Sequence, residues 1–169
     1  MGLPGSGKST VGRQLARRLG LNFADSDHVI EQRIGCSIRS FFERDGEAAF
    51  RDIEQAVIDE LMQSGPGVVA TGGGTVLRAA NRACLRANAK VIYLRSTPEE
   101  VHRRTRHDQG RPLLQVEDPM ERLRSLHAER DPLYRETAHF VIETGRPSVP
   151  TLLKMILMQL ELAGVLPPG

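Results

Sequence analysis

Eight residues at the start of the chain constrain its fold most strongly. Residues 2–9 read Gly-Leu-Pro-Gly-Ser-Gly-Lys-Ser and match the pattern GxxxxGK[ST] at every fixed position. Glycines let such a loop curl until its backbone N–H groups point inward at an anion. A helical pattern follows at once, and the N-terminus of a helix favours negative charge. The motif therefore predicts a nucleotide-phosphate site.

The same motif predicts individual roles. Lys8 would contact the β- and γ-phosphates of ATP, and the Ser9 hydroxyl would ligate Mg²⁺. A chance glycine-rich turn before a helix is the alternative, but a lysine and a serine in register argue against it. We expect the nucleotide-binding residues of this segment to be Gly5, Ser6, Gly7, Lys8, Ser9 and Thr10.

Strands and helices alternate along the chain. Apolar runs predict strands at 22–25, 67–71, 90–95 and 138–143. Helical spacing predicts helices over 7–20, 27–35, 37–44, 46–64, 76–87, 98–106, 119–130 and 149–163. This alternation favours an α/β three-layer sandwich with a parallel sheet and helices on both faces. Ligands of such folds bind beyond the carboxyl ends of the strands.

Length and composition limit the class of function. A chain of 169 residues with 40% hydrophobic content fits one domain over 1–169. A formal charge of +2 and only seven aromatic residues, two Tyr and five Phe, give no argument for nucleic acid as a partner. We find no apolar run of membrane-spanning length and no signal peptide, and therefore expect a cytoplasmic protein. The absence of an evident exposed apolar stripe favours a monomer.

Two aspartates follow the strand expected at 22–25. Asp25 and Asp27 would face the ligand crevice, where one carboxylate can order water on Mg²⁺ and the other can accept a proton from a hydroxyl. Helix capping is the alternative, because aspartate is common at helix starts. Capping explains one of the two aspartates better than both.

Two further features indicate an acceptor site. Arg51 and Glu54 are neighbours on a helix, and Glu54 falls beside the apolar stripe, where a carboxylate is costly unless paired. The three glycines 72–74 exceed what a turn needs, so a close approach of a ligand or another backbone is expected.

Two arginines outside these features are ambiguous from the sequence alone. Arg111 lies in a polar loop, and Arg130 lies near a helix end; alone, each could be a solvated arginine or a local ion pair.

Together these residues resemble the shikimate kinase family. The resemblance covers essentially the whole chain and rests on five blocks in the family's order: GLPGSGKST, DSD, FRDIE at 50–54, GGG, and RPLL followed by ERDPLY. It implies a fold like that of nucleoside monophosphate kinases, with strand order 2-3-1-4-5. It also implies transfer of the ATP γ-phosphate to the 3-hydroxyl of shikimate, in the route to chorismate and aromatic amino acids.

The resemblance implies roles for the residues singled out above. Asp27 would accept the 3-hydroxyl proton, and Asp25 would hold a water on the Mg²⁺. Arg111 would close over the phosphates from a lid at about 107–118, and Arg146 falls in the turn where the family touches adenine. Shikimate would bind between the helices at about 27–64 and the glycine loop, through Asp27, Arg51, Glu54, Gly72, Gly73 and Arg130.

One departure and two alternatives remain. The family's phosphate loop follows a strand, yet only Met1 precedes Gly2. We therefore expect the first strand to be missing from this chain, and about five or more apolar residues to precede Gly2 in the working enzyme. Gluconate kinase and related carbohydrate kinases share the loop and the fold. A non-catalytic nucleotide-binding domain is the alternative from another class, although the reactive side chains named above are all present.

Overall fold

The computed structural model describes residues 1–106, 117–145 and 147–167. Its four strands are β1 (Asn22–Asp25), β2 (Gly67–Ala70), β3 (Ile92–Arg95) and β4 (Phe140–Glu143). Its α-helices are α1 (Lys8–Leu19), α2 (Ser26–Ile34), α3 (Ile38–Gln63), α4 (Ala79–Asn88), α5 (Pro98–Thr105), α6 (Pro119–Thr137) and α7 (Val149–Leu162), with a 3₁₀ turn, η1, at Thr75–Leu77.

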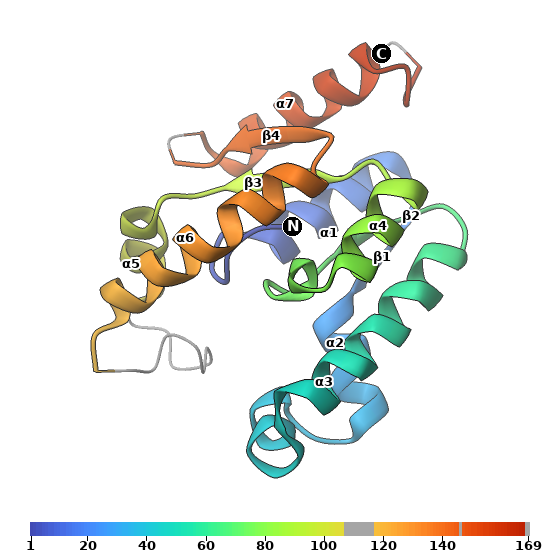
Figure 1. Ribbon diagram of the computed structural model, residues 1–169. Helices are drawn as coiled ribbons and strands as arrows, with labels where there is room; N and C mark the ends of the chain where they lie inside the picture. The colour runs from blue at the N-terminus through green and yellow to red at the C-terminus, as the bar shows by residue number, and fades with distance from the viewer. Residues whose placement is uncertain (107–116, 146, 168–169) are drawn as a thin grey trace.

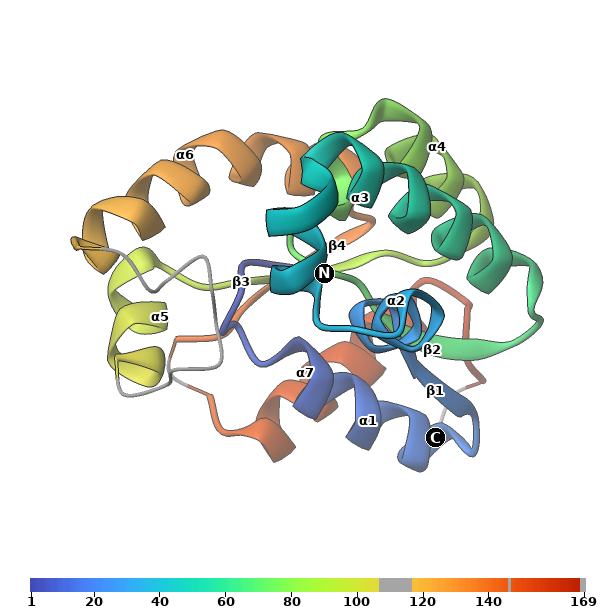
Figure 2. The ribbon, with the colours of Figure 1, turned by 90° about the horizontal axis from the view of Figure 1, so that it is seen from below.

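The elements form three layers, as the sequence predicted. Helices α1 and α7 cover one face of the strands, whereas α3, α4 and α6 cover the other (Figures 1 and 2). The strands are parallel within each pair, and β1 pairs with β2 while β3 pairs with β4. The phosphate loop, the end of β1 and the glycines after β2 therefore all come to the carboxyl edge of the strands.

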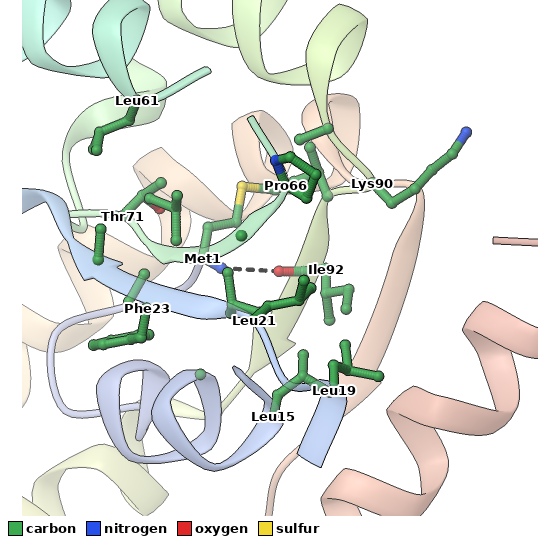
Figure 3. Close-up of a pocket in the computed structure, with 18 of the residues that line it drawn as sticks. Met1, Leu15, Leu19, Leu21, Phe23, Leu61, Pro66, Thr71, Lys90 and Ile92 are labelled. Atoms are coloured by element: carbon green, nitrogen blue, oxygen red, sulfur yellow. Dashed lines mark hydrogen bonds between the residues drawn. The ribbon is translucent and has the colours of Figure 1, made fainter. Parts of the chain in front are cut away.

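The two strand pairs are separated by a slot that Met1 enters. The Met1 amino group donates to the Ile92 carbonyl at 2.8 Å (Figure 3). The Leu94 N–H donates to the Met1 carbonyl at 2.9 Å. These two bonds are one rung of a parallel ladder on β3. The pairs β1–β2 and β3–β4, with the slot between them, agree with the predicted order 2-3-1-4-5, in which the position of the first strand holds only Met1.

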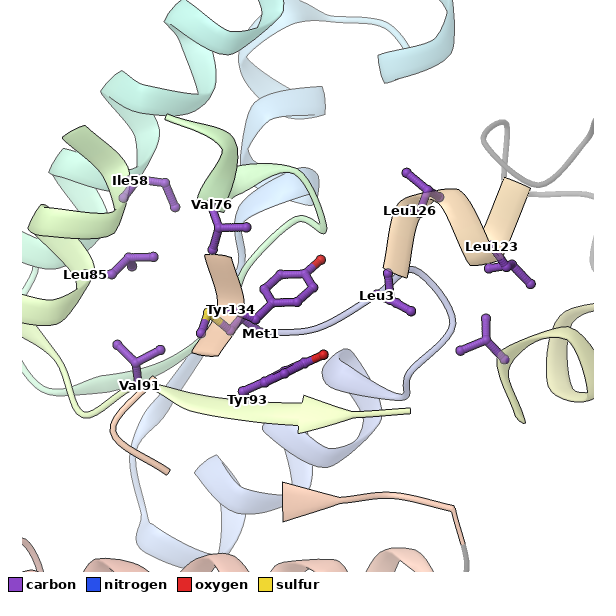
Figure 4. Packing of buried hydrophobic residues seen from close by; sticks show 11 residues of the cluster. Met1, Leu3, Ile58, Val76, Leu85, Val91, Tyr93, Leu123, Leu126 and Tyr134 are labelled. Carbon is purple, nitrogen blue, oxygen red and sulfur yellow. The ribbon is translucent and has the colours of Figure 1, made fainter. Parts of the chain in front are cut away.

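A buried apolar cluster lies between the strands and the second helical layer. The rings of Tyr93 and Tyr134 lie 4.8 Å apart at its centre, with Met1 and Leu3 beside them (Figure 4). Both tyrosine side chains and Leu3 are almost completely buried. The start of the chain is therefore part of the core, and the phosphate loop begins from a packed position.

The helices predicted at 37–44 and 46–64 are confirmed as the two segments of α3, which breaks at Gly46, where the backbone is not helical (φ 85° and ψ 172°). Two other helix predictions needed correction. The helix predicted at 76–87 is a 3₁₀ turn and a separate α4, divided at Arg78. The helix predicted to end at 130 continues through Pro132 to Thr137, because burial of Tyr134 and Thr137 outweighs the one backbone bond that proline removes.

Within the described ranges, no helix is both long enough and apolar enough to cross a membrane.

Candidate active site

The phosphate loop has the left-handed backbone that its glycines predict. Gly5 and Gly7 take φ of 83° and 89°, which only glycine adopts without strain. A Cβ at Gly5 would also come within 2.5 Å of the Thr105 methyl group in α5. The loop is therefore packed against α5 and leads directly into α1, whose first N–H groups have no partner within the helix.

The two polar residues that end the motif point to different partners. The Lys8 ammonium donates to the carbonyls of Gly2 and Leu3 at 3.0 and 3.2 Å. The Ser9 hydroxyl donates to Asp25 Oδ2 at 2.6 Å. Thr10 is exposed in the first turn of α1. Lys8 thus reaches across the phosphate loop to its first residues, and Ser9 connects the loop to the end of β1.

Ser9 and Asp25 fit a Mg²⁺ ion. Both offer hard oxygen atoms at the mouth of the phosphate loop, and Mg²⁺ in nucleotide sites takes one or two such protein groups together with phosphate and water. Among the described residues, no cluster of three or more His, Cys, Asp or Glu side chains forms a metal site. The two groups suit an ion that takes its remaining ligands from a nucleotide and from water.

Asp25 and Asp27 differ in their surroundings. Asp25 caps α2 by accepting from the backbone N–H groups of Asp27 at 3.0 Å and His28 at 3.4 Å. The capping alternative therefore holds for Asp25 alone. Burial raises the pKa of Asp27 from 3.8 to about 6; Lys8 opposes this rise, and the nearby carboxylates of Asp25 and Glu54 add to it. Asp27 is ionised at neutral pH, yet it is a stronger base than an ordinary aspartate.

The glycine loop after β2 lies against three charged side chains. A Cβ at Gly72 would overlap the Asp27 carboxylate, and a Cβ at Gly74 would overlap the Arg51 guanidinium. A Cβ at Gly73 would come within 3.1 Å of Arg130 Nη1. The sequence predicted a close approach at this loop, and the structure supplies three, one at each glycine. Larger residues here would displace the charged groups from the site.

A buried ion pair holds Arg51. Its Nη1 donates to Glu54 Oε1 at 2.9 Å, and the second oxygen of Glu54 accepts from the Thr75 hydroxyl at 3.2 Å. The Glu54 side chain is only 1% exposed. A buried carboxylate is tolerable when both of its oxygens are bonded in this way. Glu54, which the sequence placed among substrate ligands, is engaged here in orienting Arg51.

Arg130 is buried without a comparable acidic partner. It is 3% exposed, and its Nε and Nη1 make no hydrogen bond within the described residues. Tyr134, one turn further along α6, donates to the Gly73 carbonyl at 2.6 Å. Burial raises the Tyr134 pKa to about 12, with Arg130 opposing the rise, so its hydroxyl stays protonated as a donor. Unpaired guanidinium donors facing the glycine loop suit an anionic ligand.

The two loops of the site touch each other. Pro4 of the phosphate loop would meet a Cβ of Gly73 at 3.1 Å, and the Gly72 N–H donates to the buried Ser26 hydroxyl at 3.0 Å. The structure thus brings together the phosphate loop, Asp25, Asp27, Arg51, Glu54, Gly72, Gly73 and Arg130. Arg111 and Arg146, and most of the lid expected at 107–118, lie outside the described residues.

Sequence reasoning missed four residues that support the site. Ser26, Thr75 and Tyr134 bond to the glycine loop or to Glu54. Arg104 in α5 donates to the Ser6 carbonyl at 3.4 Å and to the Thr144 carbonyl at 2.8 Å, and so joins the phosphate loop to the turn after β4. Ser26 and Tyr134 lie inside motifs that were noticed, but nothing in their spacing revealed which atoms they contact.

Comparison with known proteins identifies the family. The model of the shikimate kinase family matches residues 4–161. A shikimate kinase of Paracidovorax citrulli is 64% identical over 172 residues, covering 100% of this chain and 94% of that protein. A shikimate kinase of Ralstonia nicotianae is 60% identical over 168 residues, and the match covers 99% of this chain and 88% of that protein.

The chain belongs to the shikimate kinase family.

Solved shikimate kinases share the fold described above. The enzyme from Acinetobacter baumannii in complex with shikimate matches with a TM-score of 0.91 and 47% identity, over 98% of this chain and 92% of that one. Shikimate kinase from Bacteroides thetaiotaomicron matches with a TM-score of 0.89 and 28% identity, over 95% and 96% of the two chains. A gluconokinase from Sinorhizobium meliloti, at 19% identity and a TM-score of 0.59, shares the fold alone.

The raised pKa of Asp27 predicts that its ionised carboxylate lowers the stability of the folded protein. The protonated carboxyl carries no such penalty below about pH 4, and the penalty develops as pH rises through about 6. Asp27→Asn has no ionisable group at this position and therefore lacks the penalty. In this shikimate kinase family member we expect the variant to exceed wild type in free energy of unfolding by on the order of 2–3 kcal/mol at pH 8, and by much less at pH 4.

Urea denaturation at the two pH values measures this difference. Asp25→Asn is the matched control, because it also removes one charge but retains an oxygen that can cap α2. Equal effects of Asp27→Asn at pH 4 and pH 8 would contradict the conclusion that desolvation raises the pKa of Asp27.

Proposed function

We propose that this chain transfers the γ-phosphate of ATP to the 3-hydroxyl of shikimate, giving ADP and shikimate 3-phosphate on the route to chorismate and aromatic amino acids. One observation carries the proposal. Beside the phosphate loop, the half-buried base Asp27 and two buried guanidinium groups surround one glycine loop. A ligand that carries both hydroxyl groups and a carboxylate matches this set of charges.

The nucleotide would bind along the phosphate loop. Backbone N–H groups of Gly5, Ser6 and Gly7 and the start of α1 favour phosphate oxygens. On nucleotide binding, the Lys8 ammonium would leave the carbonyls of Gly2 and Leu3 and donate to the β- and γ-phosphates. Thr10, in the same turn of α1, is proposed as a further nucleotide contact. Ser9 directly, and Asp25 through water, would hold Mg²⁺, which neutralises phosphate charge when bound. We carry Arg111 and Arg146 over from the sequence as further nucleotide contacts.

The acceptor would bind next to the glycine loop, on the far side of its contact with Pro4 of the phosphate loop. Arg51 and the Arg130 N–H donors that have no partner among the described residues suit the carboxylate of the acceptor. Glu54 holds Arg51 in place, which leaves the remaining guanidinium edge for the ligand. Backbone groups at Gly72 and Gly73 can approach the ring closely because neither residue has a side chain. Asp27 then lies at the hydroxyl end of the acceptor.

The reaction needs one proton acceptor and stabilisation of phosphoryl charge. The acceptor hydroxyl gives its proton to Asp27, its oxygen attacks the γ-phosphorus, and the bond from that phosphorus to the β–γ bridging oxygen breaks to release ADP. The raised pKa of Asp27 brings its basicity closer to the working pH, which favours proton transfer. Lys8 and the loop N–H groups stabilise the charge that develops on the transferred group.

The proposal includes finer statements about the working protein. We propose one kinase domain over 1–169, with acceptor-binding helices at about 27–64 and a lid at about 107–118. It acts as a Mg²⁺-dependent monomer in the cytoplasm, where the thiols of Cys36 and Cys84, both free, would stay reduced.

A substrate panel tests the proposed function. We expect ATP turnover with shikimate and little or none with gluconate, quinate or AMP. Lys8→Ala should lose most of this turnover because a fixed cation leaves the phosphates. Asp27→Asn should depress turnover while ATP still binds, which titration calorimetry measures. Faster turnover with gluconate would favour the carbohydrate kinase alternative, and ATP binding without turnover on any acceptor would favour a non-catalytic domain.

The contact between Gly74 and Arg51 predicts a selective kinetic effect. In Gly74→Ala the new methyl group displaces the Arg51 guanidinium, so we expect KM for shikimate to rise about tenfold or more while KM for ATP changes little. Steady-state kinetics with each substrate varied measures this. Arg51→Met should reproduce the effect, and the double variant should be no worse than Arg51→Met. Equal rises in both KM values would show that the loop does not act through Arg51.

A further inference from the structure

Asn81 is a buried polar residue of a helix that contributes no residue to the site described above. It lies in the first turn of α4, which runs beside α3 in the second helical layer (Figures 1 and 2). It is 1% exposed, and its Oδ1 makes no hydrogen bond within the described residues. A buried amide is costly unless its polar atoms are bonded, so an apolar residue would suit this position better unless the amide N–H is used.

The Asn81 amide N–H is used on the turn that follows the glycine loop. Nδ2 donates to the Thr75 carbonyl at 3.0 Å, and the Thr75 N–H donates to the Gly72 carbonyl at 3.1 Å. The backbone of Thr75 is therefore bonded on one side to the glycine loop and on the other to α4. Arg82 donates to the next two carbonyls of η1 at 2.7 and 3.3 Å, so Asn81 is the side chain of α4 that serves Thr75.

The side chain of Thr75 continues this series of bonds to Arg51. Its hydroxyl donates to Glu54 Oε2 at 3.2 Å, and Arg51 Nη1 donates to Glu54 Oε1 at 2.9 Å. Asn81, Thr75 and Glu54 are each no more than 1% exposed. In such surroundings water does not readily replace a bond that is lost, and a partly satisfied series is costly. The orientation of Arg51 thus depends on a residue of α4 through three hydrogen bonds.

We propose that Asn81 is a positioning residue for the acceptor carboxylate and acts through Thr75 and Glu54 on Arg51. Without the amide, the Thr75 carbonyl loses its donor and the Thr75 hydroxyl shifts away from Glu54. Glu54 then no longer holds the Arg51 guanidinium in one orientation. No residue of the phosphate loop belongs to this series, so ATP binding is independent of it. The inference rests on the proposed function, because it assigns the acceptor carboxylate to Arg51.

Calorimetry of shikimate and of its neutral amide tests this role. Asn81→Leu keeps most of the side-chain volume and removes the donor. We expect it to bind shikimate about fivefold or more weakly, while binding of the amide and of ATP changes by less than about twofold. A residue that only supports the fold would weaken shikimate and the amide alike, and that result would overturn the proposal.

Asn88→Leu is the matched control on the same helix. Asn88 is exposed, and its Nδ2 donates to the Cys84 carbonyl of α4 at 2.8 Å, away from η1. We expect this variant to bind both ligands as wild type does. A loss of shikimate binding equal to that of Asn81→Leu would show that any change in α4 weakens the site, and would overturn the specific role of Asn81.

A double variant tests whether Asn81 acts through Arg51. In Arg51→Met the proposed carboxylate contact is already absent, so adding Asn81→Leu should weaken shikimate binding by less than about twofold. A further loss as large as that of Asn81→Leu in wild type would mean that Asn81 acts by another route, against the proposal.

Folding and activity assays separate the remaining outcomes. If Asn81→Leu does not fold, Asn81→Ala carries the same test, and failure of both variants to fold would make Asn81 a residue of the fold and overturn the proposal. A wild type that does not phosphorylate shikimate contradicts the proposed function, and the role of Asn81 with it. Where wild type phosphorylates shikimate, unchanged shikimate binding by the Asn81 variant contradicts the role of Asn81 alone.

Discussion

The close approach of the glycine loop to three charged side chains is the constraint on which the site depends. Asp27, Arg51 and Arg130 come from three different helices, and each contacts one glycine of residues 72–74. Any side chain on this loop would move at least one charge. Tyr134 donates to the Gly73 carbonyl of the loop, and its ring packs at a tilt against Tyr93 in the core, so buried packing fixes the position of the loop.

The buried charges are compensated unequally, and this imbalance is what gives the site its chemistry. Glu54 pairs with Arg51 and is itself bonded to Thr75, so that pair is nearly complete without a ligand. Arg130 has donors with no partner in the described part of the chain, and Asp27 carries a raised pKa. In the proposed function, binding of an anion with hydroxyl groups would lower both energetic costs, so the protein gives up stability at the residues proposed to bind the acceptor and to take its proton.

Local signals in the sequence predicted much of this arrangement, whereas contacts between distant segments could not be predicted. The phosphate loop, the strands and the break at Gly46 follow from glycines and apolar spacing over a few residues. The extension of α6 through Pro132 depends on Tyr134 packing against Tyr93, about forty positions away in sequence. Glu54 was recognised as too buried for a surface ion pair, but its partner Thr75 depends on how two helices meet. The slot beside Met1 was foreseen from the family, and its register came only from the backbone bonds.

Binding of shikimate and of its neutral amide tests most directly the claim that Arg130 recognises the acceptor carboxylate. Calorimetry would compare the two ligands on wild type and on Arg130→Met, which preserves much of the apolar volume. We predict that wild type prefers shikimate by about 30-fold or more, since a buried guanidinium–carboxylate contact is worth about 2 kcal/mol or more. In Arg130→Met this preference should fall by about tenfold or more. The same preference in both proteins would contradict the account.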